Sequence, residues 1–191
     1  MGWRSAGPRA HLSRITSRLD VERASAIVHA MWREVEVRAL IDEPVERIFP
    51  YLVDPLRWHE FAPACVLRRR LGDGPVAVGA RWEAADRIGP FTIRFVDALA
   101  ELEQNQRVVW LSSAPWNARV EYICEETPGG TLIRARYGGA MSGWMRLVGL
   151  VPRPLMGRIL AQDFRRLGAL LSAEHLAAPQ AVEADGLSGL G

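Results

Sequence analysis

The sequence predicts an α+β fold in which a seven-stranded antiparallel sheet wraps around one long C-terminal helix, with two short helices after the first strand. Three observations predict it. Between about residues 35 and 140, apolar and polar side chains mostly alternate with a period of two, which is typical of half-buried strands. These strands follow one another at hairpin spacing, which favours antiparallel pairing. After Ala140 the period changes, and one helix long enough to cover a sheet face follows.

The first strand and the first helix are predicted from alternation and from the placement of prolines. Residues 35–41 alternate apolar and polar side chains, as a half-buried strand does. Pro44 then opens a helix through about Val53, because proline suits the first helical position. Pro50 lies inside this helix and lacks an N–H donor, so we expect it to kink or shorten the helix.

A second short helix and six further strands follow. Asp54 and Pro55 predict an N-cap and a first-turn proline for a helix through Phe61. The segment "TPGG" predicts a hairpin turn, because glycine supplies the positive φ that such turns need. The six strands are predicted over residues 65–71, 78–86, 91–103, 107–113, 116–126 and 131–140.

The last helix, from about Pro154 to Leu176, contains a misplaced carboxylate. At about 100° per residue, its apolar side chains form one broad arc. Asp163 falls inside this arc, whereas Arg166 falls outside it. The arc consists of Met156, Ile159, Leu160, Phe164, Leu167, Leu170 and Leu171.

Composition limits the class of protein. The chain has 191 residues, of which 49% are hydrophobic, and this fits one medium-sized domain. Cys65 and Cys124 are far apart in the sequence, which argues against a disulfide framework or a zinc site and suits a reducing compartment. No apolar run reaches about 18 residues, and the N-terminus lacks the apolar centre of a secretory signal. We therefore expect a cytoplasmic protein.

Charge is concentrated at the N-terminus. Residues 1–19 carry four of the 24 basic residues and no acidic residue, so the rest of the chain is nearly balanced. The only basic run beyond them, residues 68–70, is best explained as a solvated strand end, and we expect no nucleic-acid partner. We expect a disordered or short helical leader over residues 1–31, one folded domain over 32–176 and a disordered tail over 177–191. The absence of lysine, with abundant alanine and glycine, suggests a bacterial source.

Three segments resemble the START-like, helix-grip superfamily, often labelled SRPBCC, which includes polyketide cyclase/dehydrase-type proteins. They are "VEVRALIDEPVERIFPYLVDPLRWHEFAP" at 35–63, "VGARWE" at 78–83 and "ETPGGTLIRARY" at 126–137. The resemblance covers about residues 33–175, and the apolar stretch 141–157 is longer than the family pattern. It implies a sheet that curls around the last helix and leaves a cavity between them. Members bind lipids, polyketides, isoprenoids or hormones; some are cyclases or dehydratases and others only carry their ligand.

Apolar side chains that the alternation turns inward are the candidate ligand contacts. For each of them alone, core packing is the favoured interpretation. The cavity that the resemblance implies nevertheless requires some of them to touch a ligand, because pockets have mainly apolar walls. The candidates are Trp82, Phe91, Ile93, Phe95, Trp110 and Tyr122 on the sheet, and Met156, Leu160 and Leu167 on the helix.

Asp163 and Tyr137 are the candidate catalytic residues. Asp163 either forms a structural pair with an arginine or faces the ligand, and burial without a partner would raise its pKa. A carboxyl group with a raised pKa suits acid/base chemistry in an aldol-type cyclisation or a dehydration. Tyr137 and Tyr122 either orient a ligand carbonyl or donate to a backbone carbonyl. His59 is more simply a surface residue.

The remaining patterns exclude several kinds of chemistry and leave three functions open. The sequence contains no glycine-rich phosphate loop, no metal-ligand spacing and no serine nucleophile motif, so we expect no cofactor and no metal site. The first hypothesis is a polyketide cyclase/dehydratase-type enzyme, the second a lipid or isoprenoid carrier, and the third a protein-interaction module. The apolar segment 141–151 is a lid, a peripheral membrane-docking surface or a plain connection.

Overall fold

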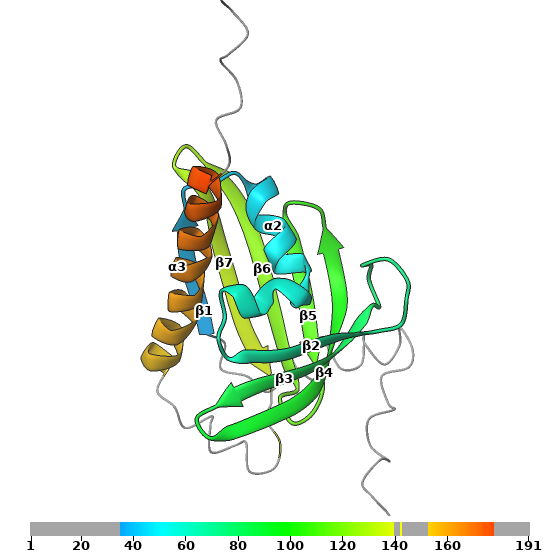
Figure 1. The fold of residues 1–191 in the computed structure, drawn as a ribbon. Helices are drawn as coiled ribbons and strands as arrows, with labels where there is room; N and C mark the ends of the chain where they lie inside the picture. Colours follow the sequence, from blue (N-terminus) through cyan, green and yellow to red (C-terminus); the bar gives the residue numbers. More distant parts are fainter. Residues whose placement is uncertain (1–34, 140–141, 143–152, 178–191) are drawn as a thin grey trace, which may run out of the picture.

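The computed structural model describes residues 35–139, 142 and 153–177 (Figure 1). Within these residues the order is one strand, two short helices, six strands and one long helix, so the predicted order is confirmed. The elements are β1 (Val35–Ile41), α2 (Val45–Val53), the 3₁₀-helix η1 (Pro55–Glu60), β2 (Cys65–Leu71), β3 (Arg81–Ile88), β4 (Phe91–Glu103), β5 (Arg107–Ser112), β6 (Ala118–Thr127), β7 (Gly130–Gly139) and α3 (Arg153–Ala177). The predicted leader, the tail beyond Ala177 and, apart from Ser142, the connection 141–151 lie outside the described residues.

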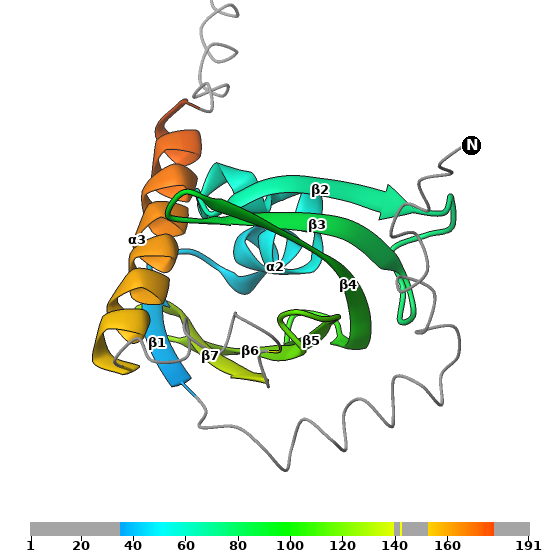
Figure 2. The same ribbon diagram turned by 90° about the horizontal axis from the view of Figure 1, so that it is seen from below.

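The strands form one antiparallel sheet in the order β1-β7-β6-β5-β4-β3-β2. From β2 to β7 each strand pairs with its neighbour in the sequence, while β1 pairs with β7. Figure 2 shows β2 and β3 lying across from β5, β6 and β7, with α2 between the two parts and α3 alongside β1. This arrangement is a helix-grip fold, and the predicted fold class is confirmed.

The two short helices follow the predicted proline and aspartate signals. Pro44 occupies the N-cap position of α2, and the helix continues through Pro50 to Val53, so Pro50 does not shorten it. Its missing N–H removes only one bond of the short helix, and the buried face of α2 compensates. Asp54 caps η1 as predicted, because its Oδ1 accepts the Leu56 N–H at 3.0 Å.

Two strands begin later than predicted. β3 begins at Arg81 rather than at residue 78, and β6 begins at Ala118 rather than at residue 116. Gly79 has a φ of 92° and Asn117 a φ of 42°. A left-handed residue interrupts the extended backbone, so each strand starts after it. The alternation of apolar and polar side chains in the sequence gives no sign of these turns.

α3 packs one stripe of side chains into the core. Phe164, Leu167 and Leu171 are each 2% exposed or less, as the predicted arc requires. The arc is narrower than predicted, however, because Ile159 is 48% exposed. At 100° per residue, Ile159 lies about 140° around the helix from Phe164, which places it beyond the buried stripe.

Polar contacts fix the C-terminal half of α3 against α2 and η1. The Tyr51 hydroxyl donates to Glu174 Oε1 at 2.6 Å, and the Arg47 guanidinium donates to the Leu171 carbonyl oxygen at 3.0 Å. The Arg57 guanidinium carbon lies 3.4 Å from the centre of the Tyr51 ring, in a cation–π contact. These contacts hold the helix that covers the sheet in one position.

Gly130 provides a test of how tightly the turn before β7 packs. Its φ is 104°, and a Cβ there would overlap the Ile41 carbonyl oxygen. A Cβ on the adjacent Gly129 would meet only the Leu40 side chain, at 3.7 Å. We expect Gly130→Ala to lower the free energy of unfolding by about 1–3 kcal/mol and Gly129→Ala to change it by less than about 0.5 kcal/mol. Urea denaturation of both variants measures the difference, and equal effects would contradict this account of the turn.

Candidate functional site

Three tryptophans form an aromatic wall on the concave face of the sheet. Trp82 and Trp110 are 0% and 1% exposed, so their predicted inward positions are confirmed. The ring centres of Trp82 and Trp110 are 5.1 Å apart, and those of Trp58 and Trp110 are 5.3 Å apart, both edge to face. Trp110 Nε1 also donates to the Leu52 carbonyl oxygen at 3.1 Å. Trp110 is therefore held on two sides and forms a rigid part of the wall.

A second, smaller apolar cluster lies towards the β3–β4 hairpin. Ile93 and Phe95 are buried there as predicted, and the Phe95 ring lies 6.2 Å from the Trp116 ring. The predicted inward position of Phe91 is wrong, because this residue is 55% exposed. Phe91 pairs with Ile88 at the last position of the hairpin, so its side chain lies beyond the edge of the packed cluster.

Two tyrosines lie between the sheet and α3. The Tyr122 ring is 6.1 Å from both the Tyr137 ring and the Phe164 ring. Burial raises the pKa of both phenols above their ordinary value, and a hydrogen bond between them raises the pKa of Tyr137 and lowers that of Tyr122. The two hydroxyls therefore partner each other, which differs from the backbone contact that was one alternative.

Asp163 lies at the edge of the buried stripe of α3 and forms the arginine pair that was one of its two interpretations, while a contact with ligand stays a prediction. Its Oδ1 accepts from Arg166 Nη1 at 3.0 Å, and its side chain is 19% exposed. Burial raises its pKa to about 6, against the opposing effect of Arg166. The negative charge of Asp163 in turn helps to raise the pKa of Tyr122, Tyr137 and Cys65. Asp163 is thus paired with Arg166, and its charge acts on the two buried phenols.

The other helix candidates differ in burial. Leu167 is 0% exposed and belongs to the hydrophobic core. Leu160 is partly buried against that core, and Met156 is half-buried. Whether any of the three touches a ligand stays a prediction.

Sequence analysis missed a buried ionic cluster centred on Arg68. The segment 68–70 was interpreted as a solvated strand end, and this is wrong for Arg68, whose side chain is only 5% exposed. Arg69, the next residue, is 69% exposed and pairs with Glu83. The reason is the pleat of β2, which turns successive side chains to opposite faces and aims Arg68 into the concave side.

Four of the five guanidinium protons of Arg68 have partners within the concave side. Nη1 donates to the carbonyl oxygens of Leu67 at 2.7 Å and Ala85 at 3.1 Å. Nη2 donates to Cys65 Sγ at 3.2 Å and to Asp86 Oδ1 at 2.8 Å. Asp86 is thereby ion-paired, and the guanidinium plane is fixed in one orientation.

Asp97 is the second carboxylate of this cluster. It is 2% exposed, and its Oδ1 accepts from the Ser112 hydroxyl at 2.6 Å. Burial raises its pKa to about 6, against the opposing effect of Arg68. On β4 it shares the inward face with Phe95 and Leu99. A carboxylate on an apolar face is the signal that drew attention to Asp163, and it was equally available for Asp97.

Charges from both polar clusters act on the same buried groups. The pKa of Cys65 is raised first by burial and then by charges from both clusters, Asp86 and Asp97 on the sheet and Asp163 on α3. Tyr122 is likewise affected by Asp163 and Asp97. The concave side therefore combines apolar aromatic walls with a few titratable groups, which is the composition of a small-molecule site.

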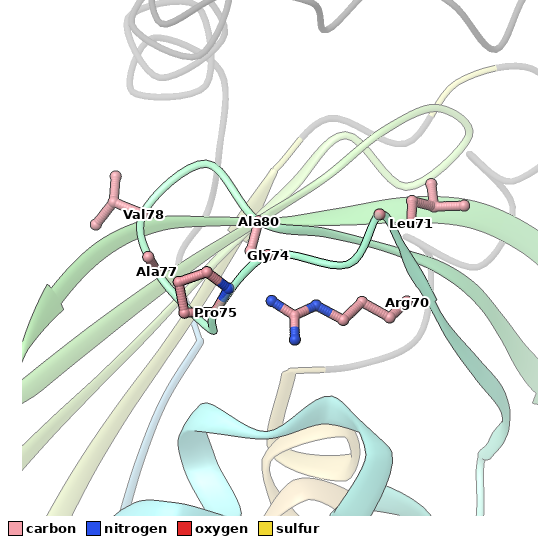
Figure 3. Close-up of a pocket in the computed structure, with 8 residues that line it drawn as sticks. Arg70, Leu71, Gly74, Pro75, Ala77, Val78 and Ala80 are labelled. Atoms are coloured by element: carbon pink, nitrogen blue, oxygen red, sulfur yellow. The ribbon is translucent and has the colours of Figure 1, made fainter.

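A pocket of about 170 Å³ opens at the loop between β2 and β3. Figure 3 shows the Arg70 guanidinium reaching towards Pro75 across this pocket. The guanidinium carbon also lies 5.5 Å from the centre of the Trp82 ring. The pocket is lined by Arg70, Leu71, Gly72, Gly74, Pro75, Ala77, Val78 and Ala80.

The described residues contain neither a membrane-spanning helix nor a cluster of metal-binding side chains. None of their helices is long and apolar enough to cross a membrane. No group of three or more His, Cys, Asp or Glu side chains in this part of the chain could hold a metal ion.

One family model matches most of the chain. The family model described as "Polyketide cyclase / dehydrase and lipid transport" matches residues 33–172. No curated protein sequence matches the chain.

Three solved structures illustrate the likeness in fold. A Staphylococcus aureus protein of unknown function has a TM-score of 0.61 at 12% identity, covering 76% of this chain and 97% of its own. A Thermus thermophilus protein has a TM-score of 0.62 at 13% identity, covering 74% and 99%. The di-domain ARO/CYC StfQ from the steffimycin biosynthetic pathway has a TM-score of 0.59 at 12% identity, covering 82% of this chain and 56% of its own. At these identities the likeness extends to the fold alone.

Proposed function

Because the chain belongs to the polyketide cyclase/dehydrase and lipid transport family, we propose that it binds a hydrophobic small molecule on the concave side of its sheet and catalyses an acid/base step on it. The ligand class is a polyketide, lipid or isoprenoid. One observation carries the proposal: Asp163, Tyr122 and Tyr137 are titratable groups gathered beside aromatic walls, and burial raises the pKa of all three.

The proposed chemistry is an aldol cyclisation followed by loss of water. Asp163, with a pKa of about 6, is suited to exchange protons near neutral pH. Its carboxylate takes a proton from a carbon between two ketone groups of a poly-β-ketone. The resulting enolate carbon bonds to a second ketone carbon of the same chain. Asp163 gives this proton to the alkoxide oxygen that forms, which becomes a hydroxyl. Asp163 then takes the second proton from the same carbon; a carbon–carbon double bond forms as the hydroxide leaves, and Asp163 protonates the hydroxide to water.

Tyr137 orients the reacting ketone. Its raised pKa keeps the phenol protonated at neutral pH, so the hydroxyl donates a hydrogen bond. Such a donor stabilises the negative charge that develops on the ketone oxygen. Without ligand, this phenol proton is shared with Tyr122. When the ketone binds, the Tyr137 O–H turns to the ketone oxygen, and the Tyr122 O–H donates to the Tyr137 oxygen and holds it in place.

Ligand carriage without catalysis is the second candidate function. The ion pair between Asp163 and Arg166 favours it, because a carboxylate held by an arginine acts as a structural group. In that case the concave side would release its ligand unchanged. Docking of the segment 141–151 on a membrane surface would allow the ligand to pass between the membrane and the protein.

One assay separates the two candidates. The chain is incubated with synthetic poly-β-ketone thioesters, and in parallel with a panel of phospholipids and isoprenoid quinones. Native mass spectrometry records complexes, and mass spectrometry of the extracted ligand records products. We expect complex formation and a poly-β-ketone product lighter by one water. Complexes whose ligands all return unchanged would favour the carrier, and no complex with any panel member would contradict ligand binding altogether.

A further inference from the structure

Buried polar atoms without hydrogen-bond partners gather around the Arg68 cluster. Six buried side-chain atoms of the described residues make no hydrogen bond; four of them are Arg68 Nε, Asp97 Oδ2, Trp82 Nε1 and Trp116 Nε1, and the other two are Arg119 Nε and Arg134 Nε. Trp82 and Asp97 are paired residues of β3 and β4. Unpaired buried polar atoms are rare and costly in folded proteins, so a local group of them calls for a polar partner, either water or a ligand group.

Arg68 and Asp97 leave one donor and one acceptor side by side. The four Nη protons of Arg68 are already used, which leaves its Nε–H. The Ser112 hydroxyl donates to Asp97 Oδ1, so Oδ2 is the carboxylate oxygen without a hydrogen bond. Arg68 Nε and Asp97 Oδ2 are 3.6 Å apart, too far for a hydrogen bond between them. The two side chains are 5% and 3% exposed, so their unused atoms are withdrawn from bulk water.

The charges around this pair exclude most ligand groups. Arg68 carries one positive charge, and Asp86 and Asp97 carry two negative ones when ionised, so a carboxylate or phosphate would meet excess negative charge. A carboxylate would also bring no proton for Asp97 Oδ2. An ammonium group would face the guanidinium and leave Arg68 Nε unpaired. A ketone or ether would accept from Nε and leave Oδ2 unpaired.

A hydroxyl group fits both atoms. Its oxygen accepts the Arg68 Nε–H, and its proton is donated to Asp97 Oδ2. The aromatic surroundings suit a flat apolar framework, because the guanidinium carbon lies 5.2 Å from the centre of the Trp58 ring and 5.5 Å from that of Phe95. We infer that the pair formed by Arg68 and Asp97 receives a neutral hydroxyl of the ligand, that of a phenol, an enol or an alcohol. The inference rests on the proposed ligand-binding function and narrows its substrate class.

Naphthalene probes that differ in one substituent test the inference on the unaltered protein. The probes are 2-naphthol, 2-methoxynaphthalene and 2-naphthoate, and tryptophan fluorescence titration at neutral pH gives each dissociation constant. We expect 2-naphthol to bind about tenfold more tightly than 2-methoxynaphthalene, which accepts but cannot donate. We expect 2-naphthoate to bind most weakly.

Two variants, each of which removes one negative charge, test whether Asp97 causes the preference for 2-naphthol over 2-methoxynaphthalene. Asp97→Asn removes the free carboxylate acceptor, and we expect it to bring the ratio between 2-naphthol and 2-methoxynaphthalene close to one. Asp86→Asn removes the same charge from the same cluster but keeps Asp97 Oδ2, so we expect it to retain the preference. Circular dichroism confirms that each variant is folded. If Asp97→Asn does not fold, the three probes on the unaltered protein and on Asp86→Asn still decide the matter.

The outcomes are distinguishable. Equal binding of 2-naphthol and 2-methoxynaphthalene by the unaltered protein would overturn the inference while leaving ligand binding intact, and buried water would then be the partner of these atoms. Tightest binding of 2-naphthoate would overturn it as well. Failure of all three probes, together with failure of the lipid and poly-β-ketone panel, would contradict the proposed function and the inference with it.

Discussion

Arg68→Met is expected to lower the free energy of unfolding by about 3–5 kcal/mol, because it leaves buried carboxylates without their counter-charge. The Arg68 guanidinium donates to Asp86 Oδ1 at 2.8 Å and lies 3.6 Å from Asp97 Oδ2. Without it, Asp86 and Asp97 must take up protons or stay charged in an apolar environment, and either change costs free energy. Urea denaturation at pH 7 measures the loss.

Arg69→Met is the matched control for this prediction. It makes the same substitution one residue further along β2, where the side chain is 69% exposed and pairs with Glu83 on the outer face. We expect a change of no more than about 1 kcal/mol, as for other exposed ion pairs. We also expect Arg68→Met combined with Asp86→Asn and Asp97→Asn to recover part of the lost stability. A loss from Arg68→Met no greater than that from Arg69→Met would refute the buried ionic cluster.

Asp163→Asn is expected to lower turnover by roughly 10²–10⁴-fold and to raise stability at neutral pH. Asparagine keeps the shape of the side chain but cannot exchange a proton. Turnover is measured with the poly-β-ketone thioester that gives the dehydrated product. A variant that folds and turns over at the unaltered rate would exclude Asp163 as the acid/base group.

The stability effect of Asp163→Asn follows from the raised pKa of the carboxyl. Its pKa is about 6 in the folded protein, against an ordinary value of 3.8 in the unfolded chain. Between these two values the folded state binds more protons than the unfolded state, so the contribution of Asp163 to stability falls as the pH rises. We expect the variant to gain about 1–3 kcal/mol above pH 6 and nothing below about pH 3.8, where Asp163 is protonated in both states.

Arg166→Gln supplies an independent check on the role of Asp163. The Arg166 guanidinium lowers the pKa of Asp163, so its removal raises that pKa further. We expect the acidic limb of the pH profile of turnover to move to higher pH in this variant. Arg165→Gln, which alters an exposed arginine next to it, is expected to leave the profile in place. A profile unmoved by Arg166→Gln would mean that the limb belongs to another group.

Most of the fold was predictable because its signals are local. The alternation in residues 35–41 and the Asp54-Pro55 cap each report a backbone conformation of their own neighbourhood. The starts of β3 and β6 could not be predicted, because the left-handed residues Gly79 and Asn117 lie within otherwise alternating stretches.

The candidate site was only partly predictable because it depends on contacts between distant residues. Asp163 was found from a mismatch on its own helix, and Trp82 and Trp110 from alternation on their strands. The burial of Arg68 was not predicted, because its environment is formed by Asp86 and Asp97 on two other strands. A run of three arginines on one strand must send the middle side chain to the opposite face from its neighbours, which was the available signal.

The order of the strands also constrains how the protein is made. β1 leaves the ribosome early but pairs only with β7, and Arg136 of β7 donates to Glu36 of β1 from 100 residues further along the chain. Until then β1 has no strand partner, and long-range pairing of this kind folds slowly. The nascent chain therefore carries exposed hydrophobic segments until α3 has been synthesised. We expect general chaperones that shield such segments to influence its yield more than its final stability.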